Sequence, residues 1–400
     1  MIFFIQLIAT LLVSVLLIYL TITTFYLLIL AISFYITRER KMGSDQPLNR
    51  FAVLVPAHNE ELLIGILCQS LLDVDYPRDK YVVHIIADNC SDSTADIAAS
   101  LCAKVLERTD PADVGKGQAL SWALQRIDLD QFDAVLIVDA DNYVGNNILT
   151  ELNRMINSGE QSIQCYNAVG NRADSWFTQL LYVSRTIGNL LYHEAKYRLG
   201  LSSYLMGNGL CFRAELLKKK GWTAFSVGED WEYYAQLVES GVMVAFAAKA
   251  KVFHQESKSL NQATSQRLRW SSGRFYVAWT QGLPLLFKGL RKKNWHVVDA
   301  SLPLLTPNYS LLINLTLVGF FISLLLPTTN LKLFLLIAFF LLIMAQFTLF
   351  VTGAFIAGSP IKTSKAVLYV PFFLVWKAVI DILCITGLYR GKKWVRTKRH

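Results

Sequence analysis

The feature that most constrains the fold is an apolar run at residues 134–138 that stops abruptly at Asp139 and Asp141. Such a run is typical of a strand buried on both faces of a parallel sheet. Open α/β sheets bind their ligands at the carboxyl ends of the strands. The two carboxylates cannot be core residues, because burying an unpaired carboxylate is costly. Their oxygens suit a hard divalent cation, and Mg²⁺ typically binds together with phosphate. The stretch therefore predicts a metal–diphosphate site.

Short apolar segments alternate with amphipathic helices on either side of this run. Further strands are predicted at 51–55, 81–87, 104–106 and 242–247, and helices at 62–72, from about 94 and from about 117 to 127. Strand–helix alternation implies a right-handed, doubly wound parallel sheet. Polar residues follow three of the strands, after 55, after 87 and after 138. These three polar tips should therefore meet at one edge of the sheet and form a binding site.

The composition indicates membrane segments. Apolar residues make up 53% of the chain and its mean hydropathy is +0.36, both high for an ordinary soluble protein. Residues 1–37 carry no charged side chain and lack the features of a cleaved signal peptide, so we expect an uncleaved membrane helix. The apolar stretches 309–327 and 333–357 are also long enough to span a bilayer.

The formal net charge of +9 is concentrated next to these apolar segments. Basic clusters at 38–41, 288–293 and 390–399 lie where the positive-inside rule places cytoplasmic ends. This placement argues against a nucleic-acid-binding protein, since no recognition-helix pattern or zinc spacing accompanies the charge. The six cysteines include no C-x-x-C pair, which argues against a zinc site or a disulfide framework and fits a cytoplasm-facing catalytic part.

Two later segments are predicted to lie at the membrane surface. Residues 266–283 mix aromatic side chains with Arg and Gln, which is typical of an interfacial helix. Residues 366–388 contain Lys377 and Asp381, four residues apart on one helical face, where they can pair. If this segment spanned the membrane, the basic tail would lie outside, so an interfacial or re-entrant helix is favoured over a span.

These observations divide the chain into six parts. They are an N-terminal transmembrane helix (1–37), a linker (38–50), a cytoplasmic catalytic domain (51–260), a segment of interfacial helices (261–300), C-terminal transmembrane or interfacial helices (301–388) and a basic cytoplasmic tail (389–400). We expect a multi-pass plasma-membrane protein in contact with membrane lipids. The sequence does not specify whether partner subunits complete an export path.

Five motifs, in this order, resemble those of the membrane-bound family 2 glycosyltransferases, the group that contains cellulose, chitin and hyaluronan synthases. The motifs are Pro56-Ala57-His58-Asn59-Glu60, Asp88 within Ala87-Asp88-Asn89-Cys90, Asp139-Ala140-Asp141, Glu229-Asp230, and Gln266-x-x-Arg269-Trp270. The resemblance runs from about residue 51 to 275 and includes the flanking membrane segments. It implies a GT-A fold, which is Rossmann-like, for 51–260, and inverting, metal-dependent transfer of a sugar from a UDP-sugar.

The resemblance assigns the first motifs to the donor. Pro56, His58, Asn59 and Glu60 would line the pocket of the base, and Asp88 would accept a hydrogen bond from the uracil ring or the ribose; its alternative role is a plain turn residue at a helix entry. Lys116 follows Gly115 and precedes Gly117, at a helix start, where it could reach the diphosphate with backbone N–H groups assisting. The alternative for Lys116 is an exposed turn lysine.

The metal would be Mg²⁺ or Mn²⁺, since both take carboxylate oxygens. Asp141 should bind it directly, and Asp139 should bind the ribose or the metal. His254 is a candidate third ligand, but a lone His after a strand is more often a structural group, and its place in the sequence is not one where the family suggests histidine. The ligand role of His254 therefore stays open.

The last two motifs would serve the acceptor and the chemistry. Asp230 is the candidate general base, with Glu229 as the lesser candidate, because an inverting transfer needs a carboxylate to take the hydroxyl proton. Arg269 would counter the charge on the leaving diphosphate. The remaining candidates for substrate contacts are Trp270 as an apolar platform for the acceptor sugar, Gln266 as a hydrogen-bonding neighbour, and Gly207, Asn208 and Gly209 as an acceptor-side loop.

The function expected from these residues is that of a UDP-sugar-dependent glycosyltransferase with a polysaccharide or oligosaccharide acceptor. The alternative is a single transfer to a lipid acceptor, because few C-terminal segments are available for a polymer channel. A non-catalytic membrane scaffold is a remote third possibility, since none of the acidic motifs is missing. The donated sugar, the acceptor and the linkage are not evident from the sequence.

Overall fold

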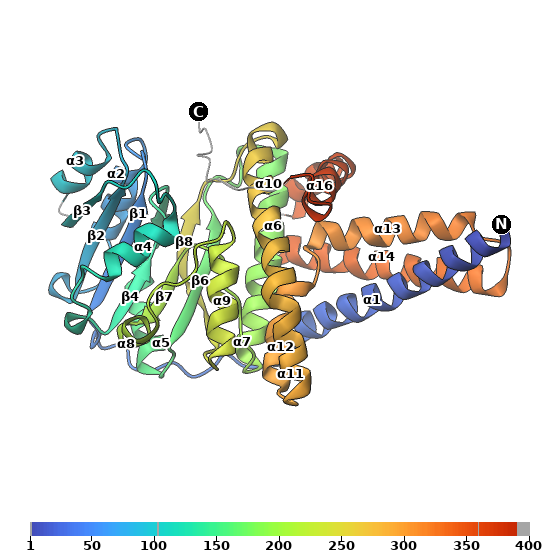
Figure 1. The fold of residues 1–400 in the computed structure, drawn as a ribbon, viewed down its shortest axis with the longest axis horizontal. Coiled ribbons are helices and arrows are strands. Elements are labelled where there is room, and N and C mark those ends of the chain that lie inside the picture. Colours follow the sequence, from blue (N-terminus) through green and yellow to red (C-terminus); the bar gives the residue numbers. More distant parts are fainter. Residues whose placement is uncertain (1, 102–103, 359, 390–400) are drawn as a thin grey trace.

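The computed structural model describes residues 2–101, 104–358 and 360–389. An α/β domain stands at one end and a group of long apolar helices at the other, with a layer of helices between them (Figure 1). The strands of the domain are β1 (Phe51–Ala57), β2 (Tyr81–Asp88), β3 (Lys104–Arg108), β4 (Ala134–Ile137), β5 (Asn142–Val144), β6 (Ser162–Val169), β7 (Leu210–Arg213) and β8 (Val244–His254). The basic tail from residue 390 lies outside the described residues.

The sheet is mixed, and the parallel sheet predicted from the alternation of strands and helices from residue 51 to 138 forms one part of it. Its eight strands run in the order β3-β2-β1-β4-β7-β6-β8-β5. The first four are parallel, as the alternation of strands and helices predicted. β7 then pairs antiparallel with both β4 and β6, and β5 pairs antiparallel with β8. The strand predicted at 242–247 begins at Val244 and continues to His254, because β8 pairs with β6 over this whole length around one irregularity.

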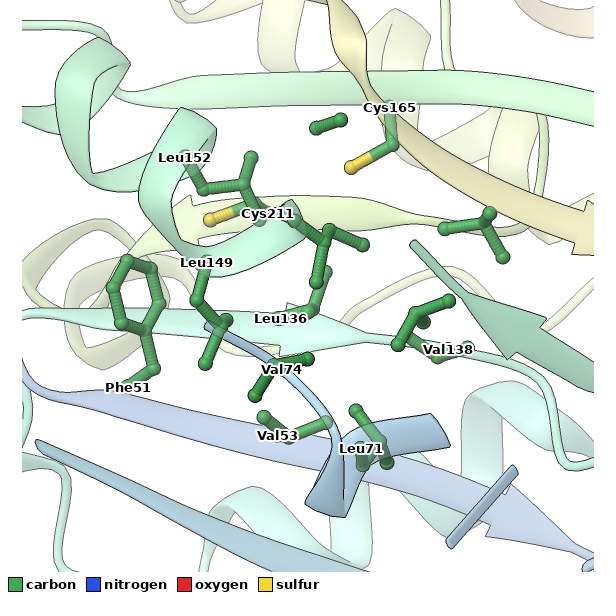
Figure 2. Packing of buried hydrophobic residues seen from close by; sticks show 14 of the residues in the cluster. Phe51, Val53, Leu71, Val74, Leu136, Val138, Leu149, Leu152, Cys165 and Cys211 are labelled. Carbon is green, nitrogen blue, oxygen red and sulfur yellow. The ribbon is translucent and has the colours of Figure 1, made fainter. Parts of the chain in front are cut away.

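Both faces of β1 and β4 are buried, as the apolar run predicted. Phe51, Val53, Leu136 and Val138 pack on one face, where Figure 2 shows them against Leu71, Leu149 and Leu152 of two covering helices. The alternate residues Ala52, Leu54, Val135 and Ile137 pack on the opposite face. Side chains of a strand alternate between faces, so a strand that is buried on both must be apolar at every position.

Helices on the two faces of the sheet are α2 (Ile64–Leu72), α3 (Thr94–Ser100), α4 (Lys116–Leu124), α5 (Ile148–Asn157), α8 (Ala214–Lys220) and α9 (Glu229–Glu239), with short turns at η1 (Arg78–Lys80) and η2 (Leu129–Gln131). The predicted linker is held against this domain: the backbone N–H of Gly43 donates to the carbonyl of Arg154, and the Arg154 guanidinium pairs with Asp45. The chain therefore runs along α5 before it enters β1.

The intermediate layer contains α6 (Trp176–Thr186), η3 (Ile187–Glu194), α7 (Ala195–Arg198), α10 (Leu260–Val277), η4 (Ala278–Gly282), α11 (Leu283–Arg291) and α12 (Trp295–Leu305). Its long helices run across the direction of the apolar helices (Figure 1). Large aromatic side chains remain exposed on this layer, and Trp279 is 68% exposed. Exposed aromatic side chains are typical of interfacial helices, which is the arrangement that the sequence predicts for 266–283.

The apolar group contains α1 (Ile2–Ile36), α13 (Tyr309–Leu325), α14 (Asn330–Ile356), α15 (Pro360–Val367) and α16 (Val370–Ile385). In the described part of the chain, Gln6–Ile36 and Asn330–Ile356 are each long and apolar enough to cross a bilayer. The pairs α12–α13 and α15–α16 are bent by 76° and 60°, and counting each as one span gives four. The bend before α16 fits the broken or re-entrant segment favoured from the sequence. Lys377 does pair with Asp381, as their spacing predicted.

Candidate active site

The three predicted polar tips do meet at one edge of the sheet. β1 is hydrogen-bonded to β2 on one side and to β4 on the other, and all three are parallel. Their carboxyl ends therefore lie side by side. Asp139, Ala140 and Asp141 occupy the turn between the end of β4 and the start of β5.

The first and second tips interlock. Asn59, in a left-handed conformation with φ 57°, accepts a 2.7 Å hydrogen bond from the backbone N–H of Ser91. Nδ1 of His58 lies 2.7 Å from the backbone oxygen of Asp88. The backbone N–H of Glu60 donates to Oγ1 of Thr94 at 2.8 Å. His58, Asn59 and Glu60 thus hold the loop after Pro56 against the loop after β2.

Asp88 is largely buried and is not simply a turn residue. Its Oδ1 lies 2.7 Å from Nη1 of Arg108, the residue that faces it across the β2–β3 pairing. Burial raises the pKa of Asp88 above its usual value, although the Arg108 guanidinium opposes the shift. Nothing in the sequence pattern singled out Arg108, because the pairing of two strands decides which residue faces Asp88.

Lys116, at the start of α4, joins the donor and acceptor parts of the site. Its ammonium lies 2.6 Å from Oδ1 of Asp139 and 3.6 Å from Oε1 of Glu229, and it donates to the carbonyl of Gly207. Burial lowers the pKa of Lys116, but the charges of Asp139 and Glu229 outweigh this effect, so the pKa stays above its usual value. Lys116 is therefore a fixed cation of the site and not an exposed turn lysine.

Glu229 and Asp230 open α9 and turn into the same space. Burial raises the pKa of Glu229 to about 7, against the lowering effect of Lys116. Burial also raises the pKa of Asp230 to about 6, and the backbone N–H of Trp231 opposes this shift. Gly207 allows the close approach of Asp230, because a Cβ on this glycine (φ 78°) would stand 3.3 Å from the Asp230 carboxylate. A carboxyl group of raised pKa in a cleft is suited to proton transfer.

The Gln266-x-x-Arg269-Trp270 motif lies within α10. Arg269 faces the acidic centre: burial lowers its pKa, and the charges of Asp139, Glu229, Asp230 and Asp141 all oppose that shift. Trp270 remains 36% exposed, as an acceptor platform must be. Gln266 is half-buried, and no hydrogen-bond partner for it is found among the described residues.

Two arginine side chains lie close to the Trp270 ring. The guanidinium carbons of Arg267 and Arg185 lie 4.7 Å and 6.0 Å from the centre of the ring. Both guanidiniums pair with Glu256, whose side chain is only 1% exposed, at 2.6 Å and 3.5 Å. The sequence pattern did not indicate that Glu256 and Arg185 contribute to this site. They lie in separate elements, the loop after β8 and α6, and only the fold brings them together.

Asn208 is buried and supports the turn that carries Asp139 and Asp141. It is not part of an exposed loop. Its Oδ1 accepts from the backbone N–H of Asp139 at 3.1 Å, and its Nδ2 donates to Oδ1 of Asn167 at 3.3 Å. Asn189 in η3 in turn bonds both backbone groups of Asn167. Gly209 (φ 64°) packs closely on Cys165, where a Cβ would stand 2.8 Å from the Cys165 Cβ. Only Gly207 of this loop borders the space between Lys116 and Asp230.

His254 does not complete a three-ligand set with the two aspartates. The described residues include no group of three His, Cys, Asp or Glu side chains close enough to hold a metal ion. Nε2 of His254 instead lies 3.0 Å from Oε1 of Glu256. The cause is the path of β8: His254 is the strand's last residue and faces Asn142, while Asp139 lies before β5 begins.

The donor set at Asp139 and Asp141 nevertheless fits a divalent cation. Arg269 interacts with four carboxyl groups, and Lys116 interacts with three of them. The carboxyl groups outnumber the two cations, and carboxylate oxygens are ligands that both Mg²⁺ and Mn²⁺ prefer. The two aspartates would supply two coordination positions and leave others for oxygens of a bound diphosphate.

Comparison with characterised proteins identifies this arrangement. The chain is 25% identical over 272 residues to the probable glycosyltransferase YdaM of Bacillus subtilis. This alignment covers 65% of this chain and 64% of that protein. It is 27% identical over 242 residues to β-monoglucosyldiacylglycerol synthase of Trichormus variabilis, over 55% of this chain and 50% of that protein. The chain thus spans between half and two thirds of the length of these relatives.

Among solved structures, the mannosyltransferase PcManGT of Pyrobaculum calidifontis, in complex with GDP-Man and Mn²⁺, has the same fold. The TM-score is 0.60 at 17% identity, over 92% of this chain and 99% of that one. The family model described as glycosyltransferase like family 2 matches residues 47–273, which is more than half of the chain. The chain therefore belongs to the family 2 glycosyltransferases, and its α/β domain has the GT-A fold.

Proposed function

We propose that this protein transfers one sugar, with inversion, from a UDP-sugar to the hydroxyl group of a membrane lipid. The observation that carries the proposal is the convergence of three separate motifs: Asp139 and Asp230 both interact with the Lys116 ammonium, and Arg269 interacts with the same two carboxylates. This arrangement combines a diphosphate-binding corner, a carboxylate base and a guanidinium in a single site. The family to which the chain belongs supports this chemistry.

The donor would lie across the tips of β1, β2 and β4. Pro56 and the loop containing His58, Asn59 and Glu60 would wall off the base, and Asp88, held by Arg108, would accept from the uracil ring or the ribose. Lys116 and Arg269 would bind the diphosphate and counter the charge that grows on it as the glycosidic bond breaks. A Mg²⁺ or Mn²⁺ ion held by Asp141 and Asp139 would add to this charge compensation.

The acceptor would approach from the side of α10. Trp270 would support its apolar part, and Asp230 would accept the proton of the attacking hydroxyl as the new bond to the anomeric carbon forms. The helix N-terminus at Asp230 favours the carboxylate, while burial favours the carboxylic acid, and the two effects together leave the pKa of Asp230 at about 6. Such a group is mostly ionised at neutral pH and still basic enough to take a proton.

A lipid acceptor is favoured by two observations. The T. variabilis relative is named for the synthesis of a glycolipid. The described helices provide two membrane spans, or four with the bent pairs, and the Trp270 platform lies on the helix layer that faces them (Figure 1). A polysaccharide or oligosaccharide acceptor, the leading expectation from the sequence, is the second candidate. We further propose that the α/β domain faces the cytoplasm of a multi-pass plasma-membrane protein.

Incubation of the full-length protein in lipid nanodiscs with UDP-glucose, UDP-galactose, UDP-GlcNAc or GDP-mannose tests the proposal. The nanodiscs should contain diacylglycerol or phospholipid, and products should be identified by mass spectrometry. We expect a divalent-cation-dependent product that is heavier than its lipid by one residue of the donated sugar and that Asp141→Ala abolishes. A ladder of oligosaccharides would instead establish the polymer-forming alternative. Absence of transfer from every donor in the presence of Mn²⁺ would refute a transferase activity.

A further inference from the structure

The helix that carries the candidate base touches the helix that carries Arg269 through two glycines. Gly228 immediately precedes α9, and Gly273 lies inside α10; both are buried. A Cβ on Gly273 would stand 2.8 Å from the backbone nitrogen of Gly228. A Cβ on Gly228 would stand 2.9 Å from the carbonyl carbon and oxygen of Gly273. The two backbones are therefore in direct contact, with no room for a side chain on either residue.

Neither glycine is explained by its backbone conformation. Gly228 has φ −109°, which any residue can adopt, and Gly273 lies in a regular stretch of α10. Glycine inside a helix costs about 1 kcal/mol relative to alanine. What requires glycine at both positions is the close approach of the two chains, since the atoms that a methyl group would meet are backbone atoms that no rotamer change can move.

The contact lies directly beneath the catalytic groups. Asp230 is two residues beyond Gly228, in α9. Arg269 is four residues before Gly273, about one helical turn, so Arg269 and Gly273 lie on the same side of α10. The distance between the Asp230 carboxylate and the Arg269 guanidinium therefore depends on how closely α9 and α10 approach at this point. That distance decides whether Asp230 can contact the acceptor hydroxyl while Arg269 contacts the diphosphate of the donor.

A second interaction holds the same two helices in register. The Arg274 guanidinium carbon lies 5.4 Å from the centre of the Trp231 ring, next to Asp230. Nη2 of Arg274 also donates to the carbonyls of Pro303, at 3.3 Å, and of Thr306. These carbonyls belong to the bend between α12 and α13, so α10 connects the active site to the point where the chain turns from the helix layer into the apolar helices.

We propose that Gly228 and Gly273 are positioning residues whose backbone contact sets the separation between the base Asp230 and Arg269. The inference rests on the proposed transferase function and concerns the transfer step, not the binding of UDP. A methyl group at either position would push the N-terminus of α9 away from α10. The donor would still bind at the tips of β1, β2 and β4 and against Arg269 of α10, because the displaced segment is the start of α9, which carries Asp230 and no group assigned to the donor.

The experiment compares Gly273→Ala and Gly228→Ala with Gly65→Ala in the full-length protein in nanodiscs. Gly65 is a matched control, since it also lies in a helix and its added Cβ would meet only side-chain atoms at 3.8 Å or more. We expect kcat for transfer to fall about 100-fold in each of the first two variants, the effect of a displacement of roughly 1 Å. The Kd for UDP with Mn²⁺, measured by calorimetry, should change less than about twofold, a change of only a few tenths of a kcal/mol.

The double variant provides a readout that two unrelated structural defects would not give. Because each single substitution breaks the same contact, Gly228→Ala/Gly273→Ala should lose no more activity than the more impaired single variant. Full kcat in Gly273→Ala, additive losses in the double variant, or loss of UDP binding or of cooperative thermal unfolding in both single variants would overturn the inference. A wild-type protein that transfers no sugar would overturn the proposed function and the inference with it, whereas an active wild type makes the variants decide the inference alone.

Discussion

At the scale of single residues, the site is defined by an imbalance of charge. Arg269 interacts with Asp139, Asp141, Glu229 and Asp230, and Lys116 interacts with three of these, Asp139, Glu229 and Asp230. Burial raises the pKa of these three carboxyl groups. The consequence is that both Glu229 and Asp230 titrate close to neutral pH. Groups of ordinary pKa could not exchange a proton with a sugar hydroxyl under those conditions as readily.

Removal of the candidate base should affect chemistry and not binding. Asp230→Asn keeps the size of the side chain and one acceptor oxygen but cannot act as a base. We expect kcat to fall by about 10²–10⁴-fold, while the Kd for UDP stays near the wild-type value. Steady-state kinetics and calorimetry on the same nanodisc preparation provide the two numbers. An Asp230→Asn variant with wild-type kcat would assign the base to another group, with Glu229 the first to test.

The raised pKa of Asp230 also predicts a pH dependence. A base acts only when deprotonated, so kcat should be constant at higher pH and fall as the pH drops through about 6, the pKa of Asp230. If Glu229 were the base, the midpoint would lie near its own pKa of about 7. A pH–rate profile of the wild type and of Glu229→Gln distinguishes the two assignments. If Glu229 is the base, the fall in kcat at low pH disappears in Glu229→Gln; if Asp230 is the base, this fall remains.

At the scale of elements, a series of hydrogen-bonded asparagines supports the turn that carries Asp139 and Asp141. Asn189 of η3 holds Asn167 of β6, which contacts Asn208, which holds the backbone of Asp139. Asn208 is 6% exposed and Asn189 1% exposed, so neither can contact a substrate without rearrangement. An eight-residue π-helix at η3 places Asn189 opposite β6. Unusual helix geometry of this kind is frequent at functional sites.

Asn208→Ala tests this support. Loss of its oxygen leaves the backbone N–H of Asp139 without its partner, so we expect the protein to lose about 1–3 kcal/mol of stability. The concentration of Mn²⁺ needed for half-maximal activity should rise as well. Asn146→Ala is the matched control, because Asn146 is an exposed asparagine in the segment that follows β5. Thermal unfolding measures the stability, and a Mn²⁺ titration of activity measures the metal requirement. An unchanged Mn²⁺ requirement would contradict the proposal that Asn208 supports the metal ligands Asp139 and Asp141.

At the scale of the whole molecule, buried polar contacts tie the apolar helices to the catalytic domain. Asp381 of α16 is completely buried, pairs with Lys377 and accepts from Oγ of Ser271 in α10 at 3.1 Å. Nδ2 of Asn308, which caps α13, lies 3.4 Å from its other oxygen. Through Ser271, α16 is fixed to the same helix that carries Arg269 and Trp270.

Breaking this ion pair should be more damaging than removing it. Asp381→Leu leaves the Lys377 ammonium buried without its partner, and we expect a loss of about 3–5 kcal/mol. The double variant Asp381→Leu/Lys377→Met should recover much of this stability, because it leaves no buried charge uncompensated. Unfolding of the protein in a mild detergent, followed for both variants, checks this expectation. A double variant that is less stable than Asp381→Leu would show that the pair stabilises the fold by itself.

The amino-acid sequence determined the elements and the chemistry of the site. An uninterrupted apolar run followed by two aspartates is typical of a buried strand that carries carboxylates at a sheet edge. Local patterns predicted β1, β2 and β4, and apolar length predicted α13, to within a few residues. The same local rules failed for β8, whose length is set by its pairing with β6, and they did not show that β7 runs antiparallel to β4. Pairing between distant strands leaves no local signature.

The tertiary structure decided which residues meet. The partner of Asp88 depends on the register of β2 with β3, the burial of Asn208 depends on β6 and η3, and His254 is directed to Glu256 by the course of β8. The contact between Gly228 and Gly273 joins positions that are distant in the sequence, and glycine is common enough that neither is conspicuous alone. The motifs supply the catalytic groups, whereas their distances follow from packing, which only the folded chain determines.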